Sequence, residues 1–235
     1  MTLIAANLQA VRARIEQAAI AAGRDPATVG LLAVSKTWPA DALRAAAAAG
    51  QRAFGENYVQ EGADKVAELA ALDLEWHFIG PLQSNKTRPV AGAFDWVHSI
   101  DRLKIADRLS AQRDAHLPPL NVCIQVNVSG EDSKSGVAPD ELPALAQAVA
   151  ALPRLRLRGL MCIPEPTDDV ALLRSRFATL RTLKDALVAD GLALDTLSMG
   201  MSHDIEAAIA EGATIVRVGT AIFGARPYPT AVAPA

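Results

Sequence analysis

A lysine at the end of an apolar run is the residue of this sequence best suited to covalent chemistry. Lys36 follows the run 31–34, which has strand length, and Pro39 then starts an Ala-rich segment that we expect to be helical. A lysine at the end of a buried strand is held rigidly at its base, and partial desolvation favours the neutral amine that attacks an aldehyde. A lysine that leaves the sheet and points into water is the alternative, and it is the commoner case because lysines are rarely buried. The choice depends on which polar residues the rest of the chain brings near Lys36.

Glycine and hydroxyl residues follow two apolar runs late in the sequence. Ser198-Met-Gly-Met-Ser202 continues one run, and Gly219-Thr220 follows another, 214–218. Backbone N–H groups at such turns, where helices begin, favour an anion such as phosphate. Ser202 alone is also consistent with an ordinary helix N-cap. The second turn favours the phosphate interpretation.

Arg217 is the one charged residue in the run 214–218. An arginine on such a strand is sometimes only part of a structural ion pair. In the interior of a barrel, however, it requires a specific acceptor because an unpaired buried charge is costly.

Eight strand-like runs alternate with helix-like segments along the sequence. We expect strands at residues 31–34, 52–54, 75–79, 94–98, 122–128, 157–163, 196–200 and 214–218. The alternation predicts an α/β fold, a single closed parallel (β/α)8 TIM-type barrel over residues 1–226, with an amphipathic N-terminal helix and a loose tail at 227–235. An open doubly wound sheet is the alternative, but it usually has a Gly-rich phosphate turn after its first strand, where this sequence has Lys36-Thr-Trp-Pro39.

Polar residues at the starts of helices give two capping predictions. Asn57 and Gln60 have the spacing of a capping box for a helix that runs to about Leu72. Ser99 or Asp101 is expected to cap the helix that follows the fourth strand.

A β/α barrel brings the C-terminal ends of its strands to one mouth, where phosphate commonly binds after strands seven and eight. Lys36, Asn57 and the turns 198–202 and 217–220 all fall at such ends. A lysine at one rim, a phosphate site at the other and an arginine between them fit pyridoxal 5′-phosphate (PLP), attached to the lysine as a Schiff base.

Composition bounds the class of protein. The chain has 235 residues, 51% of them hydrophobic and 21% charged, which is enough for one large core. A net charge of −3 argues against a general nucleic-acid binder. The two cysteines, Cys123 and Cys162, lie in apolar runs and are expected to be inert thiols of a reduced cytoplasmic protein. No apolar stretch is long enough to cross a bilayer, so we expect no membrane partner.

Six segments together resemble the pyridoxal phosphate homeostasis protein family. They are 34–37 (VSKT), 54–61 (FGENYVQE), 77–86 (HFIGPLQSNK), 126–130 (VNVSG) with 133–136 (SKSG), 197–202 (LSMGMS) and 217–224 (RVGTAIFG). The resemblance covers nearly the whole chain in order, and it implies a barrel similar to the N-terminal domain of alanine racemase.

The resemblance also implies the roles of particular residues. PLP would be bound covalently to Lys36, with its phosphate held by Ser202, Gly219 and Thr220. The remaining implied contacts are Arg217 at the pyridine nitrogen, Asn57 near the ring and Met199 packed close by. Lys86 and Lys134 are implied, more loosely, in a second and weaker interaction with PLP.

Two functions remain open from the residues. One is a PLP-binding protein that stores, buffers or delivers the cofactor, with no catalytic residue, and with PLP-dependent apo-enzymes as recipients. The other is a small PLP-dependent amino-acid racemase. An arginine at the ring nitrogen weakens the ring as an electron sink, and racemisation needs a base on each face of the substrate. The only tyrosines, Tyr58 and Tyr228, lie in the second helix and the tail. These points favour the carrier.

Other sites are disfavoured. His77 and His98 on adjacent strands have no third ligand at zinc spacing, so we expect core or rim histidines and no metal. A phosphate-sugar enzyme on the same barrel would use the late turns equally well. The family resemblance favours a monomer.

Overall fold

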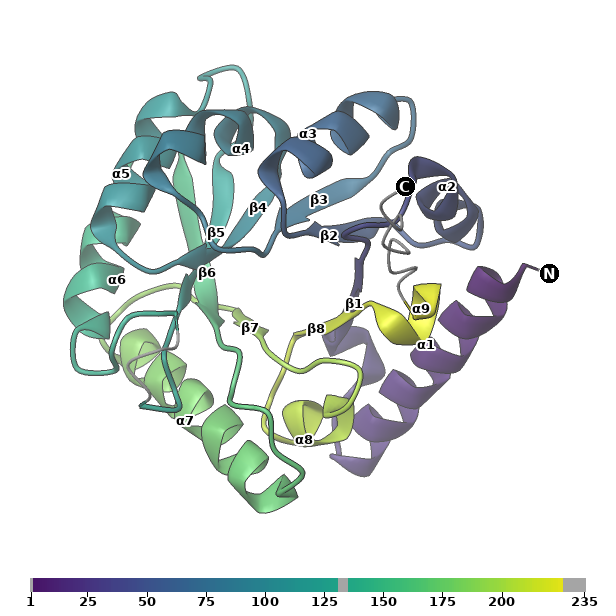
Figure 1. The fold of residues 1–235 in the computed structure, drawn as a ribbon. Coiled ribbons are helices and arrows are strands. Elements are labelled where there is room, and N and C mark those ends of the chain that lie inside the picture. Colours follow the sequence, from purple (N-terminus) through teal and green to yellow (C-terminus); the bar gives the residue numbers. More distant parts are fainter. Residues whose placement is uncertain (1, 131–134, 226–235) are drawn as a thin grey trace, which may run out of the picture.

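The computed structural model describes residues 2–130 and 135–225, and in them eight parallel strands form a closed barrel. Each strand pairs with its neighbour in sequence, and β1 pairs with β8 to close the ring (Figure 1). The strands are β1 Gly30–Val34, β2 Ala53–Glu56, β3 Glu75–Phe78, β4 Trp96–Ile100, β5 Leu120–Gln125, β6 Leu155–Met161, β7 Thr196–Ser198 and β8 Ile215–Val218. The predicted fold class is therefore confirmed.

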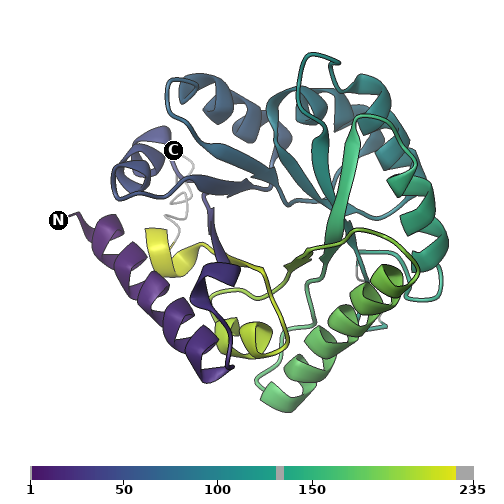
Figure 2. The same ribbon diagram turned by 180° about the vertical axis from the view of Figure 1, so that it is seen from behind.

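Helices form the outer layer of the barrel, and the view from behind shows the same ring (Figure 2). The α-helices are α1 Leu3–Ala21, α2 Ala40–Ala48, α3 Val59–Glu68, α4 Thr87–Ala93, α5 Leu103–Gln112, α6 Leu142–Ala150, α7 Val170–Ala189, α8 Ile205–Ala210 and α9 Thr220–Phe223. Two 3-10 turns, η1 Pro26–Thr28 and η2 Ser84–Lys86, complete the elements. Among the described residues, no helix combines the length and the apolar character needed to span a membrane.

The N-terminal helix α1 supplies part of the helical layer around β8, where the helix that follows this strand is very short. The helix α9 after β8 has only four residues, and α1 packs beside both α8 and α9. Leu8, Val11 and Ile15 form the buried face of α1, as helical spacing predicts. Asn7 Nδ2 also donates to the carbonyl oxygen of Ile222 in α9 at 2.9 Å. The first helix is thus joined to the last.

Each observed strand begins or ends one to three residues from its predicted bounds, and the differences at β4 and β5 have identifiable causes. β4 begins at Trp96 rather than residue 94, because Phe94 is the C-cap of α4 and its N–H donates to the carbonyl oxygen of Val90. β5 ends at Gln125 rather than residue 128. Beyond it, the Asn127 side chain accepts from the N–H groups of Ser129 and Gly130 and closes a turn.

Both capping predictions are wrong. α3 begins at Val59 and ends at Glu68, and the Gln60 amide donates to Asp64 instead of reaching back to Asn57. α5 begins at Leu103 without a side-chain cap. Ser99 is buried in β4, and the Asp101 carboxylate is taken up by Arg102. The Gln60 amide and the Asp101 carboxylate are instead hydrogen-bonded to charged neighbours, Asp64 and Arg102.

Candidate functional site

Six predicted site residues line one pocket of about 220 Å³ at the C-terminal mouth of the barrel. Each lies just after the end of a strand or, for Arg217, on β8 itself. The lining consists of Val34, Lys36, Asn57, Ile79, Ile163, Met201, Ser202, His203, Arg217, Gly219 and Thr220. Met199 directly follows β7, is fully buried and is not part of the lining. Met201 contributes the methionine side chain instead.

The backbone that carries Lys36 is held on both sides. Thr37 adopts a left-handed conformation with φ of 68°, which is unfavourable for a β-branched residue. Its N–H donates to Glu61 Oε1 of α3 at 2.5 Å. On the other side, the carbonyl oxygen of Ser35 accepts from Lys65 Nζ at 2.8 Å. These contacts hold the backbone on both sides of Lys36, just after the end of β1.

A buried ion cluster behind Lys36 was missed from the sequence. Lys65 Nζ lies 2.8 Å from Glu56 Oε1 and 2.6 Å from Glu61 Oε1, and Ser35 Oγ donates to Glu56 Oε1 at 2.6 Å. Burial raises the pKa of Glu56, and the charge of Lys65 opposes that rise. A charged residue within a strand (Glu56) and a lysine nine positions later were the available signals. The side on which α3 packs could not be read from them.

Asn57 is brought to the pocket by the close approach of two loops. A Cβ at Gly80 would lie 2.1 Å from the Asn57 carbonyl oxygen, so only glycine allows this packing. The Asn57 Oδ1 atom is buried and has no hydrogen-bond donor within the described part of the chain. A buried acceptor of this kind at a pocket wall is suited to a ligand hydroxyl or N–H group.

The turn after β7 is braced from three directions. Gly200 has a φ of 93°, and its carbonyl oxygen accepts from the Arg217 backbone N–H at 2.9 Å. Asp204 Oδ1 accepts from the N–H of Met201 at 2.5 Å, and burial raises the pKa of this carboxyl. Arg14 of α1 donates to the carbonyl oxygen of Ser202 at 2.6 Å. Ser202 is therefore not the N-cap of α8, which begins at Ile205.

Arg14 is a second residue that sequence reasoning missed. Its guanidinium also forms two 2.6 Å hydrogen bonds to the Glu206 carboxylate, which hold the pKa of Arg14 above its ordinary value. It comes from the outer helix α1, far from Ser202 in sequence, and nothing in the helical pattern distinguishes it from other exposed arginines.

Arg217 is buried in the barrel, and each of its terminal nitrogens donates one hydrogen bond. Nη1 donates to Ser198 Oγ and Nη2 to the carbonyl oxygen of Cys162, both at 2.9 Å. Burial lowers the pKa of Arg217, and burial raises the pKa of the Cys162 thiol to about 12. A guanidinium has no acceptor atom and keeps its proton even when buried, so Arg217 is a donor-only group at the pocket. The raised pKa of Cys162 keeps its thiol protonated.

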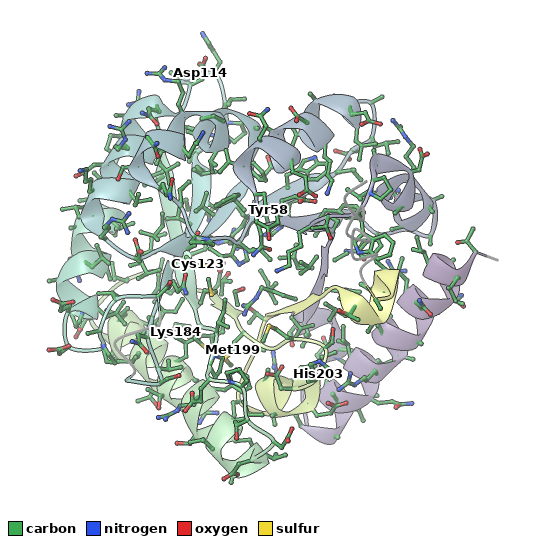
Figure 3. The ribbon with its side chains drawn as sticks, viewed as in Figure 1. Tyr58, Asp114, Cys123, Lys184, Met199 and His203 are labelled. Carbon is green, nitrogen blue, oxygen red and sulfur yellow. The ribbon has the colours of Figure 1, made fainter. Side chains whose placement is uncertain are left out.

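The remaining residues that the sequence analysis named lie in different places relative to this pocket. His203, beside α8, lines the pocket, whereas Tyr58 projects from the opposite β2–α3 side (Figure 3). Tyr58 and Lys86 line a second cavity of about 510 Å³, which shares only Asn57 with the first. Lys134 and Tyr228 lie outside the described residues. Among the described residues, no group of three or more His, Cys, Asp or Glu side chains is placed to hold a metal ion.

The pocket brings together groups that can bind an anion and react with a carbonyl carbon. It combines an amine, a donor-only guanidinium, an unpartnered amide oxygen and the hydroxyls of Ser202 and Thr220. The helices α8 and α9 have six and four residues, so their dipoles add little. Hydroxyls and backbone N–H groups would carry most of the binding of an anion.

The sequence pattern of the alanine racemase N-terminal domain matches residues 6–227. The fold and the pocket place the chain in this class of barrel. An alanine racemase from Corynebacterium glutamicum has the same fold with a TM-score of 0.70 at 19% identity, over 99% of this chain and 63% of that one.

Closer similarity is found to two proteins of a narrower group. One is the pyridoxal phosphate homeostasis protein of Pseudomonas aeruginosa, 69% identical over 228 residues, which are 97% of this chain and 98% of that protein. The other is PipY of Synechococcus elongatus in a structure with PLP bound. PipY is 42% identical with a TM-score of 0.83, over 94% of this chain and all of that one. The chain belongs to the family of pyridoxal phosphate homeostasis proteins.

Proposed function

We propose that this protein binds PLP in the pocket at the C-terminal mouth and stores, buffers or delivers it in the cytoplasm, without strong turnover of its own. The observation that carries the proposal is the convergence of Lys36, Arg217 and the Ser202 and Gly219-Thr220 turns on a single pocket. Family membership and the PLP-bound structure of PipY support it.

The residues of the pocket fit the parts of this ligand. Lys36 would hold the aldehyde carbon, Arg217 the ring nitrogen, and Ser202, Gly219 and Thr220 the phosphate. A ligand hydroxyl would supply the donor that buried Asn57 Oδ1 lacks. Met199 would support the lining residues without contacting the ligand, because it is fully buried and is not part of the lining. When bound, the group supplies an electrophilic carbon and a conjugated ring that accepts electrons.

The charge state of Arg217 supports a carrier. A guanidinium donates hydrogen bonds and accepts none, so it pairs with an unprotonated ring nitrogen. A ring without a protonated nitrogen is a weaker electron sink than one paired with a carboxylate. This arrangement retains the ligand while lowering its capacity to labilise substrate bonds. PLP-dependent apo-enzymes are the proposed recipients.

The experiment is borohydride reduction of the PLP-loaded protein followed by peptide mass mapping. We expect a phosphopyridoxyl adduct on Lys36, lost in Lys36→Ala and retained in Lys104→Ala, whose exposed lysine lies on α5. An unmodified Lys36 in protein saturated with PLP would refute the proposal.

A small amino-acid racemase is the second candidate, and one observation favours it. His203 lines the pocket together with Lys36, so two groups capable of proton transfer border the same space. Interconversion of L- and D-amino acids at ordinary enzymatic rates, abolished in both Lys36→Ala and His203→Ala, would replace the carrier with the racemase. We expect no such activity.

A further inference from the structure

A continuous chain of hydrogen bonds crosses the barrel interior from the far mouth to the pocket. Glu75 Oε1 lies 2.7 Å from His77 Nε2, and His77 Nδ1 lies 2.8 Å from His98 Nε2. His98 Nδ1 then lies 2.7 Å from Ser198 Oγ, the atom that accepts from Arg217 at 2.9 Å.

The chain joins the two ends of the barrel. Glu75 is the first residue of β3, at the mouth opposite the pocket, and its side chain is 52% exposed. His77, His98 and Ser198, on β3, β4 and β7, are almost completely buried, and Arg217 on β8 lines the pocket. Four strands therefore contribute to a single line of contacts.

The end groups give every bond one direction when both imidazole rings are neutral. The Glu75 carboxylate can only accept, and its hydrogen bond with His77 lowers the pKa of Glu75, so His77 Nε2 carries the hydrogen. If the His77 ring is neutral, it has one donor and one acceptor, so His77 Nδ1 accepts from His98 Nε2–H. Burial holds the pKa of His98 well below its ordinary value, which keeps this ring neutral. His98 Nδ1 therefore accepts from the Ser198 hydroxyl, whose oxygen is left to accept from Arg217.

We propose that Glu75, His77, His98 and Ser198 are positioning residues that form one hydrogen-bond relay of fixed direction and hold the Arg217 guanidinium at the ligand pocket. All the bond dipoles point the same way, from the donor guanidinium to the acceptor carboxylate, so each strengthens its neighbours. The relay also gives a buried cation a defined acceptor without placing a carboxylate next to the ligand. Its effect on PLP rests on the proposed function, but its direction does not.

The direction is tested in the protein without PLP, by nitrogen-15 NMR of the histidine side chains. We expect both His77 and His98 to carry their hydrogen on Nε2. Ser198→Ala should change the imidazole shifts of both rings, including His77, which is separated from Ser198 by His98. Ser99→Ala is the matched control, because Ser99 is an equally buried serine of β4 whose hydroxyl has no partner in the part of the chain described. A hydrogen on Nδ1 of either ring, or equal changes in the two variants, would overturn the relay.

The effect on the pocket is measured by titrating PLP and recording its absorption spectrum. Ser198→Ala removes one acceptor of Arg217, so we expect about tenfold weaker binding and a shifted absorption maximum. Ser198→Thr should restore both because it keeps the hydroxyl, and Ser99→Ala should stay within about twofold of the wild type. Unchanged affinity and spectrum in Ser198→Ala would refute the positioning role.

Glu75→Gln keeps the test decisive if Ser198→Ala does not fold, since Glu75 is half exposed. It should alter the His77 and His98 shifts, and unaltered shifts would refute the relay. Failure of wild-type protein to bind PLP would refute the proposed function alone, because the NMR measurement needs no ligand.

Discussion

At the scale of single residues, the buried ion pair of Lys65 with Glu56 leads to a prediction about stability. It is the counter-charge of Glu56, whose side chain is fully buried and whose second oxygen has no partner among the described residues. Removing one member of a buried pair leaves the other charge uncompensated, which costs far more than an exposed pair contributes.

We predict that Lys65→Met lowers the free energy of unfolding by about 3 kcal/mol in urea denaturation. The loss should be larger at alkaline than at mildly acidic pH. Burial already raises the pKa of Glu56, and a carboxyl with a raised folded pKa destabilises the fold as it ionises. Lys104→Met, at an exposed position of α5, should change stability by less than about 0.5 kcal/mol. Equal effects of the two substitutions would contradict this account of the cluster.

Glu165 provides a prediction with an explicit pH window. Arg176 donates to its Oε1 at 2.7 and 2.9 Å, and Ser129 Oγ donates to Oε2. These bonds lower the pKa of Glu165 from 4.5 to about 2. The pair therefore stabilises the fold fully above about pH 4.5, and this contribution is lost as the pH falls toward 2.

Arg176→Met should return the pKa of Glu165 toward its ordinary value in a carbon-13 NMR titration. The substitution should cost about 1 kcal/mol at neutral pH, with a smaller difference from the wild type as the pH falls. Arg174→Met is the control, since Arg174 lies on the same helix but pairs with Glu211. A Glu165 midpoint that stays near 2 without Arg176 would show that Arg176 is not the cause.

At the scale of elements, the loops after β2 and β3 pack directly against each other because Gly80 has no side chain. We predict that Gly80→Ala separates them, because the new Cβ would meet the Asn57 carbonyl at 2.1 Å. The expected result is a loss of at least about 2 kcal/mol of stability, and weaker PLP binding from displacement of Asn57. Gly92→Ala on α4 is the control: its Cβ would meet nothing within 4 Å, so stability should stay the same or rise slightly. Unchanged PLP affinity in a folded Gly80→Ala protein would separate Asn57 from the binding site.

At the scale of the whole molecule, the sequence was sufficient for the barrel and for the residues at strand ends. Lys36 and Ser202 could be found because they follow apolar runs, and Arg217 because it is the one charged residue within such a run. The topology of the barrel brings the ends of these runs together. The Glu56–Lys65 cluster, the Arg14 brace and the His77–His98–Ser198 contacts could not. They depend on strand register and on which side of a helix faces the barrel, and an alternating pattern does not determine either across distant segments.

The closure of the ring between β1 and β8 has a consequence for the order of events during synthesis. Lys36 follows the first strand, while Arg217 and Gly219-Thr220 belong to the last strand and its turn. The α1 helix is synthesised before its partners α8 and α9, which follow more than 180 residues later. The pocket is therefore incomplete on a nascent chain that lacks its final strand, because Arg217, Gly219 and Thr220 of its lining have not yet been made. If the proposed PLP site is correct, a complete site requires translation to have passed β8 and the turn that follows it.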